Sequence, residues 1–413
     1  MNRTLTIGLF ALSLGARATD RIVEEFGSSP TYPSITAAVA AAVDGDRIVV
    51  KNRAGNIPWI ENITVDKSLQ FLSYANNDFF YVQGNYSIEP TTGREVTIIG
   101  MRNTAGNVQA FAGASATRGT RVRILDSFFV NGGVQLASGY YDVDVVGCTL
   151  QSGSVSLYFG NVVGNDIDCS GITDQAIAVT GSSPSSLLDT CAIIGNKVKG
   201  RVGYDAIYAT GVQQVFHIRN NYVQHGWSGI NVYDGNTSAV QNLIWNNTVT
   251  AYTGNFTTYG ILIANTSAGS IWEVMNNVVT TTWSGDNRGI WKDSGNQGQI
   301  NVYFNHVTSA IGSSYAVSTG FTFASNNTIN QPITLNADGT FSNAPACVNG
   351  ANPAAVFSDL DLSAGDAGAY GGSYTLTNFH PLHAGAARTY LTGHPFNIRQ
   401  GSTLRVKATA FDR

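Results

Sequence analysis

Short runs of β-branched residues alternate with Asn and Gly along most of the chain, and one six-residue phrase returns many times. In the clear copies an apolar residue comes first, Asn-Asn or Gly-Asn stands in the middle, and a β-branched residue comes last. The clear copies are Ile193–Val198, Ile218–Val223, Ile244–Val249, Val274–Val279 and Ala324–Ile329, with a degenerate copy at Val302–Val307 and looser copies at Val162–Ile167, Val145–Leu150 and Ile124–Phe129. The phrases are too short and too β-branched for helices, so each predicts two strands around a tight bend.

The interval between the phrases indicates a repeat architecture. The fourth residues of the nine phrases run from position 127 to position 327, a mean interval of 25 residues. A second phrase lies between the copies of the first, at Ala176–Val179, Ala206–Ala209, Gly229–Val232, Gly260–Ile263 and Gly289–Lys292. A repeat of 20 to 50 residues is typical of a solenoid, and the uneven interval indicates loops of variable length between constant strands.

These patterns together predict an all-β fold, a right-handed parallel β-helix of about ten coils. Each strand is expected to pair in parallel with its copy in the next coil, about 4.8 Å away, so that equivalent side chains form ladders. Asn tolerates the left-handed backbone of a tight bend, and stacked amides can bond from coil to coil. The predicted structural ladder consists of Asn196, Asn221, Asn247, Asn277 and Asn327.

The sequence predicts four parts. They are a signal peptide at residues 1–18, a lead-in with a capping helix at residues 19–46, the β-helix at residues 47–372, and a C-terminal β tail at residues 373–413. The signal is predicted because Asn2 and Arg3 precede a short apolar core and a small-residue cleavage site. The helix is predicted because Ile35, Val39 and Val43 recur at helical spacing, and it is expected to cover the open first coil.

The C-terminal part departs from the repeat. Residues 336–372 have little strand pattern and are expected to lie across the last coil. Arg388–Leu391 and Phe396–Arg399 resemble strands, and Thr403–Ala410 alternates as a half-buried strand does. This tail either caps the last coil or joins another molecule by strand addition.

The repeats resemble those of the pectate-lyase-like right-handed β-helix superfamily over roughly residues 30–372. Tyr32–Val39 followed by Asp44–Val50 is similar to the opening of such domains, and Asp359–Asp361 with Asp366–Gly372 resembles a closing phrase of secreted bacterial members. The superfamily includes lyases, hydrolases, tailspikes, adhesins and structural proteins, so the resemblance implies a fold and no single activity. For enzymes of this superfamily it implies a site on the outer surface of the coils.

Composition narrows the function classes. Charged residues make up 12% of the chain and the net charge is −4, without a basic stripe, so nucleic acid is not an expected partner. After the signal no apolar run is long enough to span a bilayer, and the mature protein is expected to be secreted or attached to the cell surface. An even number of cysteines in an exported chain permits disulfides. Buried, stacked free thiols suit a solenoid core equally well. The four cysteines are Cys148, Cys169, Cys191 and Cys347.

Candidate chemistry is confined to the middle coils. A polysaccharide hydrolase needs two carboxylates at a defined separation, and a lyase needs a base and a cation for the uronate, but the catalytic phrases of polygalacturonases and pectate lyases are missing. The catalytic candidates that remain are Asp205, His225 and Asp234, and the carbohydrate-binding candidates are Tyr208, Trp227, Tyr233, Trp283 and Trp291. Aromatic rings can stack on sugar faces, and acids beside them can bind hydroxyl groups. The alternative interpretation is structural, with acids closing turns and aromatics packing over the edge of the solenoid.

No cofactor is expected, apart from calcium at a possible site near the end of the repeats. Asp359, Asp361 and Asp366 are the metal-ligand candidates, because calcium prefers six to eight oxygen ligands. Turn formation by these residues is the competing interpretation.

Two hypotheses of different classes follow. The first is a secreted structural or adhesive protein that forms surface structures or filaments with itself through its C-terminal tail. The second is a lyase or glycoside hydrolase whose partner is an extracellular polysaccharide. Host-glycan binding of the phage-tailspike kind is a further alternative. Low charge and the added terminal strands favour the first hypothesis, and the surface aromatics favour the second.

Overall fold

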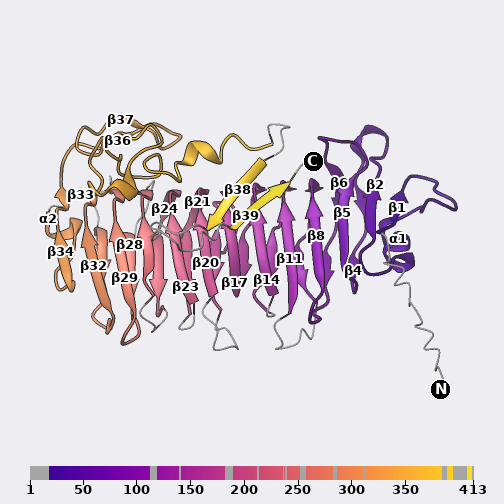
Figure 1. Ribbon diagram of the computed structural model, residues 1–413, viewed down its shortest axis with the longest axis horizontal. Helices are drawn as coiled ribbons and strands as arrows, with labels where there is room; N and C mark the ends of the chain where they lie inside the picture. The colour runs from indigo at the N-terminus through magenta and orange to yellow at the C-terminus, as the bar shows by residue number, and fades with distance from the viewer. Residues whose placement is uncertain are drawn as a thin grey trace, which may run out of the picture.

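Three long parallel sheets wind around one axis (Figure 1). The computed structural model describes residues 18–111, 119–138, 141–181, 189–211, 214–235, 237, 240–251, 257–281, 286–309, 313–383, 388–393 and 407–411. In each coil the chain passes from sheet A through sheet B to sheet C. The strands of sheet A rise at the front of Figure 1 while the chain advances toward the C-terminal end, so the winding is right-handed. The predicted right-handed parallel β-helix is confirmed.

The strands of each sheet follow one another at intervals of one coil. Among the described residues, sheet A consists of β1 (Asp20–Val23), β2 (Arg47–Val50), β5 (Leu69–Ser73), β8 (Glu95–Ile99), β11 (Thr120–Leu125), β14 (Tyr141–Val146), β17 (Phe159–Val163), β20 (Asp189–Ile194), β23 (Gln214–Arg219), β26 (Asn242–Trp245), β29 (Ile271–Met275), β32 (Gln299–Tyr303) and β34 (Phe323–Ser325). Sheet B consists, over the same ranges, of β3 (Trp59–Ile60), β6 (Phe80–Gln83), β9 (Met101–Asn103), β12 (Phe128–Phe129), β15 (Thr149–Gln151), β18 (Asp166–Asp168), β21 (Lys197–Val202), β24 (Tyr222–Gly226), β27 (Thr248–Ala251), β30 (Val278–Thr281), β33 (His306–Ser309) and β35 (Thr328–Ile329). The described part of sheet C consists of β4 (Ile63–Val65), β7 (Tyr86–Ile88), β10 (Val108–Ala110), β13 (Val134–Leu136), β16 (Val155–Leu157), β19 (Ile177–Val179), β22 (Ile207–Thr210), β25 (Ser228–Tyr233), β28 (Thr258–Ala264) and β31 (Asn287–Lys292).

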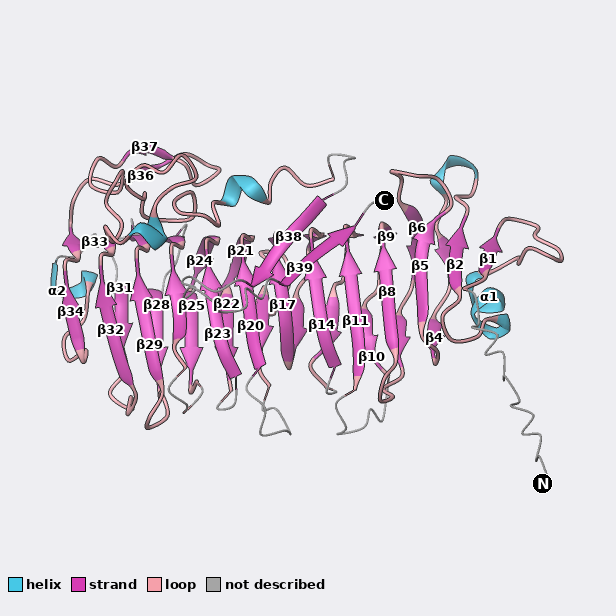
Figure 2. Ribbon diagram, viewed as in Figure 1, coloured by secondary structure: helices cyan, strands magenta, loops and turns pink. Residues whose placement is uncertain are grey.

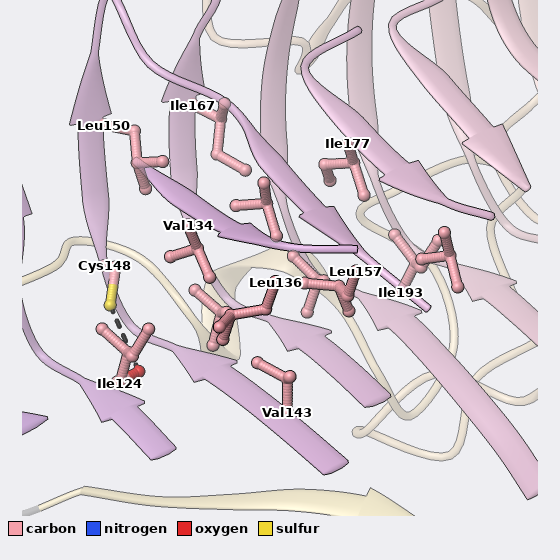
Figure 3. Close-up of a cluster of buried hydrophobic side chains, with 14 of the residues drawn as sticks. Ile124, Val134, Leu136, Val143, Cys148, Leu150, Leu157, Ile167, Ile177 and Ile193 are labelled. Atoms are coloured by element: carbon pink, nitrogen blue, oxygen red, sulfur yellow. Dashed lines mark hydrogen bonds between the residues drawn. The ribbon is translucent and has the colours of Figure 1, made fainter. Parts of the chain in front are cut away.

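The apolar residue that opens each phrase points into the coil. Seven of these residues pair in register along sheet A, and all are fully buried: Val145, Val162, Ile193, Ile218, Ile244, Val274 and Val302. Figure 3 shows the interior, where Val143 of sheet A, Leu150 of sheet B and Leu157 of sheet C are drawn. Burial of these branched side chains is the main stabilising term, because each contributes about 1.5–3 kcal/mol when it leaves water.

The Asn-Asn pairs form the bend between sheets A and B. The first residue of the pair adopts the left-handed backbone conformation, with φ of 51° at Asn220, 52° at Asn246 and 56° at Asn276. Gly195 occupies the same position with φ of 67°. Only Gly, and Asn or Asp among the other residues, adopts this conformation readily, which explains the composition of the phrase.

The second residue of the pair forms a continuous amide ladder. Each Nδ2 donates to the Oδ1 of the next coil at 2.9–3.0 Å, in the order Asn165, Asn196, Asn221, Asn247, Asn277, Asn305 and Asn327. Each Oδ1 after the first also accepts the backbone N–H of the preceding Asn. Buried polar groups are costly unless paired, and here each amide satisfies its neighbour.

Helix α1 (Ile35–Ala41) lies at the N-terminal end of the solenoid (Figure 2). Ser34 Oγ accepts the N–H of Ala37, which caps the first turn. The Glu61 carboxylate accepts two further free N–H groups, from Ile35 and Thr36. Ile35, Ala38 and Val39 are the buried residues of the helix, so it places one apolar face against the first coil.

The remaining elements are short. They are helix α2 (Ser313–Ala316), the 3-10 turns at Ala54–Asn56, Ala355–Phe357 and Leu376–Asn378, and two antiparallel pairs, β36 (Thr334–Leu335) with β37 (Phe341–Asn343) and β38 (Arg388–Gly393) with β39 (Lys407–Phe411). No helix in the described part of the chain is long and apolar enough to cross a membrane.

Residues 344–383, here called the strap, run back along the solenoid toward its N-terminal end (Figure 1). The strap follows the bend between sheets A and B, and successive bonds mark its path: His306 Nε2 to Gly350 O, Gly368 N to Asn276 O, Asn220 Nδ2 to Gly371 O, and His380 Nε2 to Gly195 O. The prediction that residues 336–372 lie across the last coil is therefore wrong for the strap. The outward residues beside the bend are apolar apart from Arg219, and the strap buries them with Phe357, Tyr374 and Phe379.

The β38–β39 pair also lies away from the last coil. Strand β38 contacts β17 and β20, in the middle of sheet A, as Figure 2 shows. The predicted strand Phe396–Arg399 and the first part of Thr403–Ala410 lie outside the described residues.

All four cysteines are buried, and no disulfide joins them. Cys148 Sγ lies 3.4 Å from Ile124 O (Figure 3), and Cys191 Sγ lies 2.7 Å from Gln214 Oε1. Burial raises the pKa of the Cys148, Cys169 and Cys347 thiols to about 12. The sequence left open whether the cysteines form disulfides or stay as buried thiols. In the structure they are buried thiols.

Candidate functional site

The outer face of sheet C is the surface on which most of the candidate residues meet. Strands β22, β25, β28 and β31 pair in register there, and one outward column contains Tyr208, Asn231, Leu262 and Trp291. Each of these side chains is partly exposed. The inward neighbours on the same strands are fully buried aliphatic residues apart from Lys292 at the end of β31, so the solenoid core holds this column in place.

Asp205 lies two positions before the first residue of β22, at the edge of this face. Its Oδ2 accepts a hydrogen bond from Asn231 Nδ2 of the next coil at 3.0 Å. Its Oδ1 is buried, and the Ser228 hydroxyl lies beside the carboxylate. Burial raises the pKa of Asp205 above its usual value. An acid with a raised pKa next to an amide can bind a sugar hydroxyl or deliver a proton.

Asp234 follows Tyr233 at the end of β25 and closes a turn. Its backbone is left-handed, with φ of 63°. Its two carboxylate oxygens accept long hydrogen bonds, 3.4 Å from Thr210 Oγ1 and 3.3 Å from Ser267 Oγ. Its carbonyl accepts the indole N–H of the buried Trp272. Asp234 therefore forms a turn with its backbone, while its carboxylate accepts only two long hydrogen bonds.

Arg288 organises the aromatic residues at the other end of the face. Its guanidinium lies 4.2 Å from the Trp291 ring and 5.3 Å from the Tyr259 ring. It is oriented by hydrogen bonds to Asp286 and to the Tyr259 hydroxyl. Trp291 also stacks on Tyr315 of α2, with ring centroids 6.4 Å apart and planes 18° apart. The result is a rigid aromatic platform that carries a cation.

Two of the sequence candidates lie away from this face. His225 is fully buried in β24, where its Nδ1 lies 3.2 Å from Trp227 O. Burial lowers the pKa of His225 to about 4, so the ring is neutral at ordinary pH. Trp227 is half-buried at the corner between β24 and β25, and its carbonyl accepts the N–H of Tyr259. Trp283 lies outside the described residues.

The three strap acids that were candidates for calcium close turns. Asp359 accepts the backbone N–H groups of Asp366 and Gly372, and Asp361 accepts that of Ser363. Asp366 Oδ1 accepts the N–H of Asn349 at 2.7 Å. Among the described residues there is no group of three His, Cys, Asp or Glu side chains that could hold a metal ion. The geometry thus agrees with the turn interpretation.

Sequence reasoning missed Asn231 and Tyr315, and it left Tyr259 out of the candidate set. Asn231 is the third residue of a repeat phrase, one coil after Tyr208, so the register of the phrases alone could have paired the two positions. Tyr259 precedes the phrase at Gly260 and pairs with Arg288. No sequence signal places Tyr315, because α2 interrupts the repeat.

Comparison with known proteins gives weak likenesses. No family model matches the chain, and no curated protein matches it. Among solved structures, the periplasmic alginate epimerase AlgG aligns with 12% identity and a TM-score of 0.37 over 69% of this chain and 76% of that chain. A point mutant of the same epimerase aligns with a TM-score of 0.40, 12% identity and the same coverage. The Dettilon tailspike protein aligns with 15% identity and a TM-score of 0.32 over 71% of this chain and 64% of that chain. Such values assign no role to any residue of this chain.

Proposed function

We propose that this protein is exported and binds an extracellular polysaccharide along the outer face of sheet C. The observation that carries the proposal is the register of this face, which places Tyr208, Asn231, Leu262 and Trp291 in one column over four coils. Aromatic rings offer flat apolar surfaces to the C–H faces of sugars. The neighbouring carboxylate and amide groups are the polar partners that sugar hydroxyls require.

The repeat distance supports a linear sugar chain as the ligand. Successive coils are about 4.8 Å apart, which is close to the length of one sugar unit. A polysaccharide lying parallel to the solenoid axis can therefore meet an equivalent position on each coil. The face from β22 to β31 covers three such steps, roughly 14 Å.

Binding can be tested with the purified protein and a panel of neutral and uronate-containing polysaccharides, alginate and polygalacturonate among them. Tyr208→Ala and Trp291→Ala are each expected to weaken binding about tenfold, since each removes a stacking surface worth about 1.4 kcal/mol. Tyr74→Ala is the matched control, because Tyr74 is 54% exposed but directly follows β5, near the N-terminal end of sheet A. Absence of binding across the panel, or equal losses in the control, contradicts the proposal.

Catalysis on the same ligand is the second candidate function. The raised pKa of Asp205 favours it, because a general acid must keep its proton near working pH. Incubation with the same panel, scored for new reducing ends and for unsaturated-uronate absorbance, tests this candidate. Asp205→Asn and Asp234→Asn should each abolish the activity. Asp66→Asn is the control, because Asp66 follows β4 at the N-terminal end of the same sheet and its side chain is 50% exposed.

A structural or adhesive use of the rod is compatible with glycan binding. A surface protein that holds a polysaccharide links the cell to its matrix without any chemistry. Assembly of the rod with itself is a separate claim, which electron microscopy at high protein concentration tests. Particles that remain single under those conditions count against assembly and leave the glycan face untouched.

A further inference from the structure

A cluster of three reactive groups lies where the strap ends, over the outer side of sheet B. His383 Nδ1 is 2.5 Å from Asp126 Oδ1, and His383 Nε2 is 2.9 Å from Thr149 Oγ1. Asp126 is the first residue after β11, Thr149 begins β15, and His383 belongs to the strap. The three residues come from distant parts of the sequence, since His383 is separated from Thr149 by 234 positions and from Asp126 by 257.

The direction of the two hydrogen bonds follows from their chemistry. An ionised carboxylate only accepts hydrogen bonds, so the proton between Asp126 and His383 is carried by Nδ1. In a neutral imidazole, Nε2 is then the acceptor, and the Thr149 hydroxyl donates to it. A base that accepts a hydroxyl proton while a carboxylate orients it is the arrangement that activates an oxygen nucleophile.

The fold does not require a charge at Asp126. Its backbone is left-handed, with φ of 44°, at the first position of the bend. Other coils place Gly195 or Asn220 at this position, with φ of 67° and 51°. Asn makes the same bend as Asp and is close to it in size, so the carboxylate adds a negative charge that the turn does not need. That charge is directed at His383.

Aromatic rings hold the imidazole in place. Phe79 meets the His383 ring edge-on at 5.2 Å, and Phe128 lies 6.1 Å from it. The side chains of His383 and Asp126 are only 17% and 10% exposed, so water competes little for their hydrogen bond. Arg102 stacks on Phe128 at 4.2 Å and shares an outward column with Phe128 and Thr149. Arg102 therefore helps to fix the Phe128 ring that borders the imidazole.

We propose that Asp126, His383 and Thr149 form a triad that cleaves esters of small carboxylic acids. Thr149 Oγ bonds to the ester carbonyl carbon while its proton moves to His383 Nε2. The bond from that carbon to the alcohol oxygen then breaks, and the alcohol leaves with the proton. Water cleaves the acyl–Thr149 ester by the same route, which releases the acid and restores the hydroxyl. This activity is independent of glycan binding on sheet C.

The test uses the full-length protein with p-nitrophenyl acetate. We expect nitrophenolate release together with an acetyl group on the peptide that contains Thr149, trapped at short times and found by mass spectrometry. Thr149→Val and His383→Gln should each lower the rate at least a hundredfold, a size typical of lost acid–base assistance. Asp126→Asn keeps the bend and should also lower the rate. His306→Gln is the control, because His306 also contacts the strap but its Nε2 meets the Gly350 carbonyl.

Two further measurements separate chemistry from strap anchoring. Thr149→Ser keeps the hydroxyl and should retain activity that Thr149→Val loses, although Val keeps the β-branched shape of Thr and Ser does not. The acetyl group should also follow the hydroxyl, so that it is found on residue 149 in Thr149→Ser and not on that residue in Thr149→Val. Acetyl groups found only on other residues, or a full rate in Thr149→Val, overturn the proposal.

Discussion

At the scale of single residues, the two asparagines of each bend have different tasks. Asn246 adopts the left-handed conformation and turns its amide outward to Asp366 O in the strap. Asn247 points inward, where its amide bonds Asn277 Oδ1 and two backbone carbonyls. The first position accepts Gly as a substitute, as at Gly195, because only backbone freedom is needed there. The second position needs an amide wherever the ladder continues.

Replacement of one ladder amide should destabilise the whole rod. Asn247→Ala removes one of the two acceptors of Asn221 Nδ2 and the amide that donates to the Ile218 carbonyl, in a fully buried place. Each unsatisfied buried group costs about 1–3 kcal/mol, so we expect a loss of about 3 kcal/mol in the free energy of unfolding. Denaturant unfolding measures it. The exposed Asn336→Ala is the control, and an equal loss in both variants contradicts the ladder's role.

His225 should make the protein less stable in mild acid. Burial lowers its pKa to about 4 in the folded state, whereas the unfolded side chain titrates near 6.5. The unfolded chain therefore gains a proton that the folded chain refuses, and the free energy of unfolding falls as pH drops from 6.5 to about 4. The contribution is roughly 3 kcal/mol, and it is constant below pH 4. His225→Gln should flatten this part of the stability–pH curve, and an unchanged slope speaks against the assignment.

At the scale of elements, the strap is a second layer along one corner of the β-helix. Its backbone and side chains bond to the bend residues, and Phe379 packs against the outward column that contains Ile194 and Val163. Gly195 is required there in addition to its left-handed φ, because a Cβ would lie 2.2 Å from the Phe379 ring. The bend composition therefore reflects both backbone conformation and room for the strap.

Removal of the Phe379 ring should release the end of the strap while the coils persist. Phe379→Ala deletes a buried aromatic side chain, a change that costs about 3–5 kcal/mol in a packed core. Hydrogen exchange is expected to accelerate in the strap and to stay slow at the ladder amides. Phe323→Ala, at a ring that is 53% exposed, is the control. Uniform acceleration in both regions means that strap and coils unfold as one unit.

At the scale of the whole molecule, a straight stack of coils converts a local pattern into a long surface. Each coil adds one residue to the outward column of sheet C at an equivalent position. The packed core fixes the spacing between successive residues of the column. A short ligand can use only a part of this column. A ligand that spans from β22 to β31 can contact Tyr208 and Trp291 together.

Affinity for the polysaccharide should therefore depend on chain length. Calorimetry with a size series of oligosaccharides from a bound polysaccharide should show tighter binding up to the length that covers about 14 Å, and a plateau beyond it. In Trp291→Ala the plateau should come earlier, since the far end of the face is lost. Affinity that is independent of length means that a single subsite accounts for binding.

The sequence predicted the fold well because the information is local and repeated. Ile193, Ile218 and Ile244 open equivalent phrases, and an inward column of such residues can be buried only if the coils stack. The bend and ladder positions follow from Gly195, Asn220 and Asn221 in the same way. The candidate site was predicted less completely. His225 was a catalytic candidate, but it lies in β24 and is fully buried.

By itself the sequence determined the winding of the chain, the inward columns and the bends, because each depends on neighbours one period away. Only the tertiary structure decided the path of the strap and the meeting of Asp126, Thr149 and His383. The strap has no repeat to set its register. Its position depends on which outward residues it can bury and bond over a distance of many coils, and such long-range contacts leave no periodic trace in the sequence.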